Sequence, residues 1–193
     1  MAGRLGMRRR AASSAEAAPA ATPDVETDAG GQLGTRYRMR ERLLAFGDDF
    51  FIENDAGQRA FWIDGKALRV RDTLMFKDMH GNEVYRIQEK VARVRDTMAI
   101  YQGNERAAVV KKALVTPLRD RYTVTIAGQP DLATRGRILQ HEYHIDRDGT
   151  PVASISKRWF RIRDTYGVDI APGQDDLLIL AVTVCVDAMS QAG

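Results

Sequence analysis

Cysteine occurs only once in the chain of 193 residues, at Cys185, so no disulfide can form within it. This cysteine usage gives no sign of an oxidising compartment and favours a cytoplasmic protein. A long hydrophobic run is also missing. The longest, residues 177–186, has ten residues, about half of what a membrane-spanning helix needs. We therefore expect no transmembrane span, and any membrane association to be peripheral, at the inner surface.

The chain also has only a small excess of positive charge and none of the common catalytic motifs. The chain has 29 Lys and Arg against 26 Asp and Glu, a net charge of +3, far below that of a dedicated nucleic-acid-binding domain. Nucleic acid is therefore disfavoured as a partner. The sequence has no G-x-S-x-G, P-loop, G-x-G-x-x-G, H-E-x-x-H or EF-hand spacing. We expect a protein that is not an enzyme and needs no cofactor.

The first 34 residues differ in composition from the rest. They consist mostly of Ala, Pro, Ser, Thr and Gly, with almost no large apolar side chain, so they cannot bury enough surface to offset the entropy of ordering. We expect residues 1–34 to be a disordered tail and residues 35–193 to be one domain. The tail has four basic and four acidic residues, so the domain carries the whole net charge, 25 minus 22.

The domain begins with short apolar runs, several of which alternate with period two, as in half-buried strands. Turn signals such as NDAG at 54–57, DMHGN at 78–82 and DRDG at 146–149 separate them. Tight turns at such regular intervals indicate antiparallel hairpins, and a meander of ten to twelve strands is expected to close on itself. The runs are FFIEN, RAFWID, TLMFKD, EVYRIQEK, TMAIYQ, RAAVVKKAL, RYTVTI, GRILQHEYHID, PVASIS and TYGVDI.

One short string recurs: LRVRDT at 68–73, ARVRDT at 92–97 and FRIRDT at 160–165, with a looser copy, PLRDR, at 117–121. Its Arg-Asp pairs are 24 residues apart twice and 44 residues apart once, and 24 residues suit one hairpin. We interpret the string as a repeated corner, in which Asp accepts backbone hydrogen bonds and Thr begins the next strand. Alternatively, the four arginines converge on one rim of the barrel and bind a phosphate.

The C-terminal run follows the turn PGQDD and is apolar on every side except at Thr183. A helix that is apolar all round must be buried, and Asp175 and Asp176 suit a helix N-terminus. We expect a buried helix over residues 175–189, although a central strand fits the same run. A helix buried on all sides needs a shell, which only the strands provide. The predicted fold is therefore mainly β, a closed antiparallel barrel around a central hydrophobic helix.

Residues 156–189, SKRWFRIRDTYGVDIAPGQDDLLILAVTVCVDAM, and 39–74, MRERLLAFGDDFFIENDAGQRAFWIDGKALRVRDTL, resemble the end and the beginning of the LURP-one-related family. The resemblance covers about residues 36–190. It implies the fold of the tubby C-terminal domain and the phospholipid scramblases, a twelve-stranded antiparallel barrel around a C-terminal helix. Tubby domains bind phosphoinositides, so the resemblance suggests an anionic-lipid-binding surface by analogy, without assigning a residue.

Basic residues surround aromatic ones in SKRWFRIR, where Lys157, Arg158, Arg161 and Arg163 flank Trp159. Such a mixture suits anionic headgroups, although it also occurs where an aromatic ring packs into a core beneath solvated basic side chains. The leading hypothesis is a non-catalytic module that binds anionic phospholipid, and the alternative is a protein-interaction or scaffold domain. The candidate anion-binding residues are Lys157, Arg158, Trp159, Arg161, Arg163, Arg71, Arg95 and Arg119.

Four further residues carry side chains with possible metal-binding, nucleophilic or acid–base chemistry. His141 and His144 are three apart in an expected strand, which would put them on opposite faces, so no metal site is expected. Cys185 lies in the apolar run and is expected to be an unreactive, buried thiol. Asp187 lies near the end of the expected helix, where a carboxylate is unfavourable. It needs a partner if it is buried, one of the arginines being a candidate, and none if it is solvated.

Overall fold

A computed structural model describes residues 34–40, 49–64, 73–90, 96–113, 121–159 and 165–191. The described residues form a closed barrel of twelve antiparallel strands, in which each strand pairs with its neighbours in sequence and β1 pairs with β12. The predicted fold class is confirmed. The strands are β1 (Thr35–Arg40), β2 (Phe50–Asn54), β3 (Arg59–Asp64), β4 (Thr73–Asp78), β5 (Glu83–Lys90), β6 (Thr97–Gln102), β7 (Glu105–Lys112), β8 (Tyr122–Ile126), β9 (Leu132–Arg137), β10 (Glu142–Arg147), β11 (Thr150–Ser156) and β12 (Thr165–Ile170).

Alternation of side chains between the core and the outside explains why these segments are strands. In β5, Tyr85 and Ile87 are buried, whereas Arg86 and Gln88 between them are only partly covered. Tight turns join the strands where the sequence predicts them. In the β2–β3 turn, Gly57 has a φ of +76°, a conformation that glycine adopts without strain, and its N–H donates to the Asn54 carbonyl at 2.9 Å.

The alternating strand directions give the barrel two distinct ends. The even-numbered strands all begin at one end, which we call the His141 end because β10 starts directly after His141. The tight turns that follow the even-numbered strands lie at the opposite end. Because α2 (Asp176–Gln191) follows β12, it enters the barrel at that opposite end and runs back toward the His141 end.

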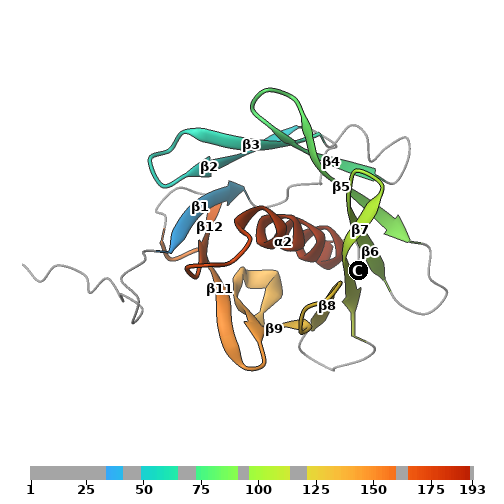
Figure 1. Cartoon of the computed structure of the whole chain (residues 1–193). Helices are drawn as coiled ribbons and strands as arrows, with labels where there is room; N and C mark the ends of the chain where they lie inside the picture. The colour runs from blue at the N-terminus through green and yellow to red at the C-terminus, as the bar shows by residue number, and fades with distance from the viewer. Residues whose placement is uncertain are drawn as a thin grey trace, which may run out of the picture.

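Helix α2 lies inside the ring of strands (Figure 1). Its described side chains from Leu178 to Ser190 are all buried, and the one polar hydroxyl in the apolar run, Thr183 Oγ1, donates to the Ile179 carbonyl at 2.9 Å. Asp175 caps the helix, accepting from the Leu178 N–H at 3.0 Å. The predicted buried helix is confirmed, and the alternative of a central strand is wrong. No helix among the described residues is long and apolar enough to cross a membrane.

The sequence suggested that the run GRILQHEYHID is one strand, but in the structure it is not. Strand β9 ends at Arg137, a short 3-10 helix, η1 (Ile138–Gln140), follows, and His141 takes the left-handed conformation with a φ of +49° before β10 begins. Gly136 makes this corner possible. Its φ is +132°, and a Cβ at this position would lie 2.6 Å from the Glu142 carbonyl oxygen. The alternation of Tyr143 and Ile145 is that of β10 alone.

Candidate functional site

The segment 157–159 holds three of the candidate anion-binding residues, and it lies beside an acidic neighbour. The Lys157 N–H donates to Glu142 Oε1 at 3.2 Å, and Arg158 Nε lies 3.7 Å from Glu142 Oε2. Trp159 is 36% exposed, and the Arg36 guanidinium lies 5.0 Å from its ring centroid. The basic group over Trp159 is thus Arg36 of β1, and Glu142, beside Lys157 and Arg158, offsets part of the positive charge of this segment.

The repeated string is described only at its ends. Thr73, Thr97 and Thr165 each begin a strand, β4, β6 and β12, as the corner interpretation expects. These three strands start at the same end of the barrel. Whether the arginines of the string are paired or free therefore stays a prediction. The candidates that lie outside the described residues are Arg71, Arg95, Arg119, Arg161 and Arg163.

Basic side chains on several strands are held by acidic side chains of adjacent strands. Such surface pairs contribute little to stability. They do neutralise positive charge that would otherwise attract an anionic ligand. The pairs and their N–O distances are Arg36–Asp169 at 3.2 Å, Arg38–Glu53 at 3.0 Å, Lys77–Asp64 at 3.2 Å and Arg135–Asp146 at 2.8 Å.

The outer face of β5, β6 and β7 differs in this respect. Arg86 and Lys90 on β5 and Arg106 and Lys111 on β7 form no ion pair with any acidic residue of the described chain. Between them, on β6, lies Tyr101, with Arg86 5.9 Å and Lys90 5.2 Å from its ring centroid. We call these five residues the β5–β7 patch. Sequence reasoning missed it because its members come from three separate hairpin positions, none of which is unusual alone.

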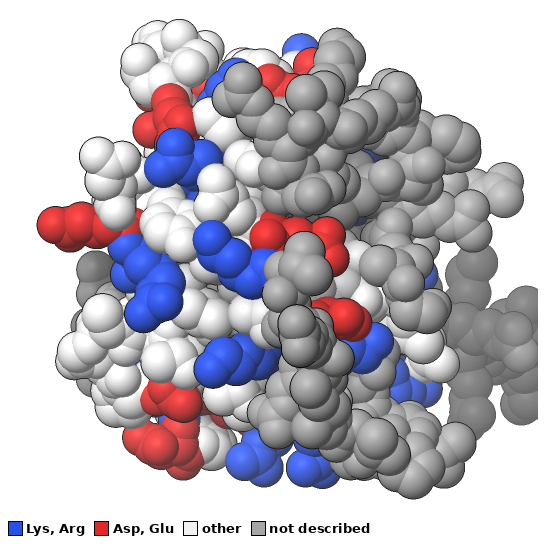
Figure 2. Space-filling model, turned by 90° about the vertical axis from the view of Figure 1, so that its right-hand side faces the viewer, with Lys and Arg blue, Asp and Glu red and all other residues white. Residues whose placement is uncertain are grey.

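Strand register sets the spacing of the patch. Arg86 and Arg106 both pair with Tyr101, while Lys90 and Lys111 both pair with Thr97. Because adjacent strands lie about 4.8 Å apart, the cations on β5 and β7 are separated by roughly 10 Å. Lys and Arg side chains run across the middle of this face, with Asp and Glu along its edges and beside the undescribed segments (Figure 2). The result is a broad cationic surface on the described part of these strands.

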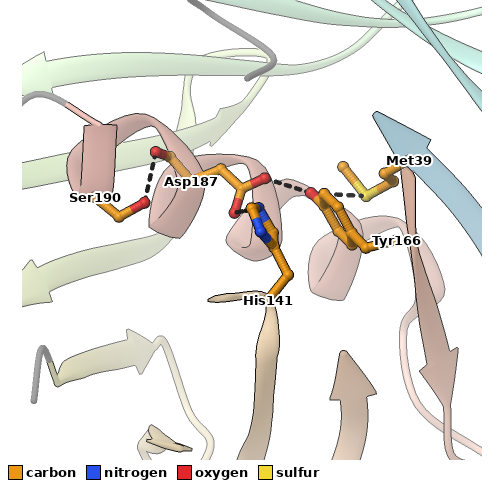
Figure 3. Close-up of polar contacts among 5 residues, drawn as sticks. All are labelled: Met39, His141, Tyr166, Asp187 and Ser190. Atoms are coloured by element: carbon orange, nitrogen blue, oxygen red, sulfur yellow. Dashed lines mark hydrogen bonds and ion pairs between the residues drawn. The ribbon is translucent and has the colours of Figure 1, made fainter. Parts of the chain in front are cut away.

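A second polar group lies inside the barrel, around Asp187. This carboxylate is fully buried near the end of α2. Tyr166, at the start of β12, donates its hydroxyl to Asp187 Oδ2, and Met39 Sδ lies 3.7 Å from the same hydroxyl (Figure 3). The Asp187 carbonyl accepts a hydrogen bond from the Ser190 hydroxyl at 2.9 Å. Of the two alternatives open in the sequence, buried or solvated, the structure shows the buried one.

His141 completes this cluster. Its ring stacks on Tyr166 with centroids 4.3 Å apart, and its Nε2 lies 3.4 Å from Asp187 Oδ1 (Figure 3). The distance is that of an ion pair when the imidazole is protonated, although neither ring nitrogen makes a well-directed hydrogen bond. The described partners of Asp187 are thus a tyrosine and a histidine, and not an arginine, which was one candidate from the sequence. The turn from η1 into β10, which no periodicity indicates, directs His141 inward.

The cluster is almost completely closed to solvent. His141 is 8% exposed and Tyr166 and Asp187 are fully buried. Burial first, then the Asp187 charge, raises the pKa of the neighbouring Tyr143 well above its ordinary value. Burial also raises the pKa of the Cys185 thiol, which keeps it protonated. His144, in contrast, is exposed on β10. No group of three or more His, Cys, Asp or Glu within reach of one metal ion occurs in the described part of the chain.

The opposite end of the barrel gives a prediction for alkaline pH. Burial, and next the charge of Asp176, raises the pKa of Tyr37 to about 12; burial and Asp175 raise that of Tyr85 to about 12. In the unfolded chain a tyrosine has a pKa near 10. Between about pH 10 and 12 the folded state therefore binds more protons than the unfolded state, and the free energy of unfolding falls as pH rises.

Chemical denaturation at increasing pH, followed by circular dichroism, should show this loss. The double variant Tyr37→Phe/Tyr85→Phe should have a shallower decline, because two of the groups that bind protons more tightly in the folded state are gone. An equal decline in both proteins would contradict the assignment.

Comparison with known proteins agrees with this architecture. The model of the LURP-one-related family matches residues 35–187. The uncharacterized protein YxjI of Bacillus subtilis (strain 168) is 23% identical over 150 residues, which cover 77% of this chain and 90% of that protein. The X-ray structure of the Arabidopsis thaliana protein AT5G01750 superimposes with a TM-score of 0.62 at 15% identity, covering 82% of this chain and 92% of that one.

The closed twelve-stranded barrel around a buried C-terminal helix defines the class of protein, and the Arabidopsis structure has the same fold. The chain belongs to the LURP-one-related family, because the family model matches most of its length. The resemblance of residues 36–190 is thereby confirmed. Neither relative has a name that states an activity.

Proposed function

We propose that this protein is a non-catalytic module that binds anionic phospholipid headgroups at a membrane surface through the β5–β7 patch. The observation that carries the proposal is the contrast between cations on the outer surface. Arg36, Arg38, Lys77 and Arg135 have acidic partners at 3.2 Å or less, whereas Arg86, Lys90, Arg106 and Lys111 have none among the described residues and lie together on three adjacent strands. Desolvating an unpaired cation against a phosphate gains a charge-assisted hydrogen bond without breaking an existing ion pair.

The shape and composition of the patch support a surface as the partner. The side chains of the patch point outward from three adjacent strands, so four cations can contact several headgroups at once. Tyr101 lies among them, with an apolar ring and a polar hydroxyl that suit the boundary between headgroups and acyl chains. The polar cluster of Asp187 and His141, in contrast, is buried inside the barrel, away from this surface.

Co-sedimentation with liposomes of phosphatidylcholine, with and without phosphatidylglycerol, tests the proposal. Each surface cation contributes about 1 kcal/mol to binding an anionic membrane, so the Arg106→Gln/Lys111→Gln variant should bind roughly thirtyfold more weakly. Binding should also weaken as salt rises, because the screening length falls to about 10 Å at 0.1 M. No binding to phosphatidylglycerol at low salt would refute the proposal.

A matched control removes two cations elsewhere. Arg137 and Arg158 are exposed and lie near Glu142, Arg137 as its strand partner. The variant Arg137→Gln/Arg158→Gln has the same change in net charge and should bind nearly as well as the unaltered protein. If this variant loses binding and the β5–β7 variant keeps it, the headgroup site is instead the segment 157–159, and the patch assignment is wrong.

A further inference from the structure

We infer that the gap between β1 and β2 is a separate binding site for a small amphiphilic anion, an apolar body with one phosphate or carboxylate. The inference goes beyond membrane binding, because it concerns a dissolved small molecule and a different part of the barrel. In Figure 1, β1 and β2 lie on the left and β6 and β7 on the right of α2.

The gap follows from the register of the strands. Strands β1 and β2 pair only through Tyr37 with Asn54 and Arg38 with Glu53. Beyond that point each strand stays attached to its other neighbour, since β1 continues along β12 as far as Arg40 and β2 continues along β3 from Phe50. The two strands are therefore held apart, and a groove of about 470 Å³ lies between them. Small-molecule sites have volumes in this range.

The groove has an apolar floor. Its base is formed by Met39 and Phe50 of the hydrophobic core, which are 0% and 7% exposed, and the apolar side chain most accessible from the groove is Phe51, half-buried on the outer face of β2. Met39 also contacts the Tyr166 hydroxyl of the buried cluster, so the groove ends where the packed interior begins (Figure 3). Apolar side chains at the base of a concavity suit the apolar part of a ligand.

The rim of the groove is positive. Its lining includes three arginines, Arg38, Arg40 and Arg59, against Asp49 and Glu53, a net charge of +1. Glu53 is already paired with Arg38 at 3.0 Å, and Asp49 has a partner of its own. Arg40 and Arg59 have no acidic partner in the described chain, and the Arg59 guanidinium lies 3.8 Å from the Phe51 ring centroid.

Two guanidinium groups that line the same groove as the half-buried Phe51 ring are complementary to a molecule with one anionic head. Arginine binds phosphate and carboxylate through two parallel hydrogen bonds, and both anions present that geometry. A cationic or neutral amphiphile of the same length would lack this interaction. A bare anion would lack the contact with Phe51 and the floor.

Isothermal titration calorimetry of the full chain with monomeric n-octyl phosphate and with octanoate tests this site. We expect binding of one molecule of either anion, and a loss of about tenfold or more in affinity in the Arg40→Glu/Arg59→Glu variant. The control Arg137→Glu reverses an exposed charge away from the groove and should bind like the unaltered protein. Octylammonium and inorganic phosphate should bind at least tenfold more weakly than octyl phosphate.

Three results would overturn the inference: unchanged affinity in the Arg40→Glu/Arg59→Glu variant, octylammonium binding as well as octyl phosphate, or inorganic phosphate binding equally well. The Arg106→Gln/Lys111→Gln variant separates the two sites. It should bind octyl phosphate normally while losing liposome binding, so either site can fail without the other.

Discussion

Removing one hydroxyl by the substitution Tyr166→Phe is expected to lower the free energy of unfolding by about 3 kcal/mol. Tyr166 donates to Asp187 in a part of the barrel where both side chains are fully buried. Without this donor, a carboxylate oxygen remains buried with no hydrogen bond, and water cannot replace it. Urea denaturation of the two proteins measures the difference.

The matched control is Tyr37→Phe, which removes a hydroxyl that donates to Asp176 at 3.1 Å. Asp176 is partly exposed, so water can solvate it after the substitution, and the expected loss is below about 1 kcal/mol. A second test replaces both members of the buried pair. Tyr166→Phe/Asp187→Leu should recover much of the loss, because no unpaired carboxylate remains. An equal loss of unfolding free energy in the Tyr166→Phe and Tyr37→Phe variants would mean that the buried hydrogen bond contributes no more to stability than the partly exposed one.

The substitution Gly136→Ala is expected to destabilise the barrel by about 3 kcal/mol, from the strain of its backbone conformation and from a clash. The added Cβ would lie 2.6 Å from the Glu142 carbonyl oxygen and 2.7 Å from Tyr143 Cα, both in the backbone of β10. A backbone neighbour cannot rotate away, so β9 and β10 would have to separate at the corner that directs His141 inward. Thermal unfolding followed by circular dichroism gives the size of the effect.

Gly128→Ala separates the two causes. Gly128 also has a positive φ, +73°, but nothing lies within 4 Å of the position of its Cβ. Its variant therefore measures the backbone strain alone, about 1 kcal/mol. If both variants lose the same stability, the close approach of β10 to Gly136 does not matter to the fold.

The architecture was largely predictable because it depends on local patterns. Alternation in segments such as β5, turn glycines such as Gly57 and an apolar run bounded by Asp175 each indicate one element. Their order then leaves few arrangements, since a helix apolar on every side must be enclosed by the only available sheet. The corner at Gly136, which sequence reasoning missed, depends on the close approach of β9 and β10, which local patterns do not show.

The sites were much less predictable. Asp187 was identified as unusual from its place in the sequence, but its partners, Tyr166 and His141, come from β12 and from the turn before β10. The β5–β7 patch needs the register that aligns Arg86, Tyr101 and Arg106, and the groove needs the divergence of β1 and β2.

The sequence by itself therefore determined the elements, their order and the burial of the helix, because hydrophobic periodicity and turn chemistry act between near neighbours. Only the tertiary structure decided which charges are paired and which remain free. Ion pairing depends on distances of a few ångströms between residues far apart in the chain, and strand register, rather than composition, sets those distances.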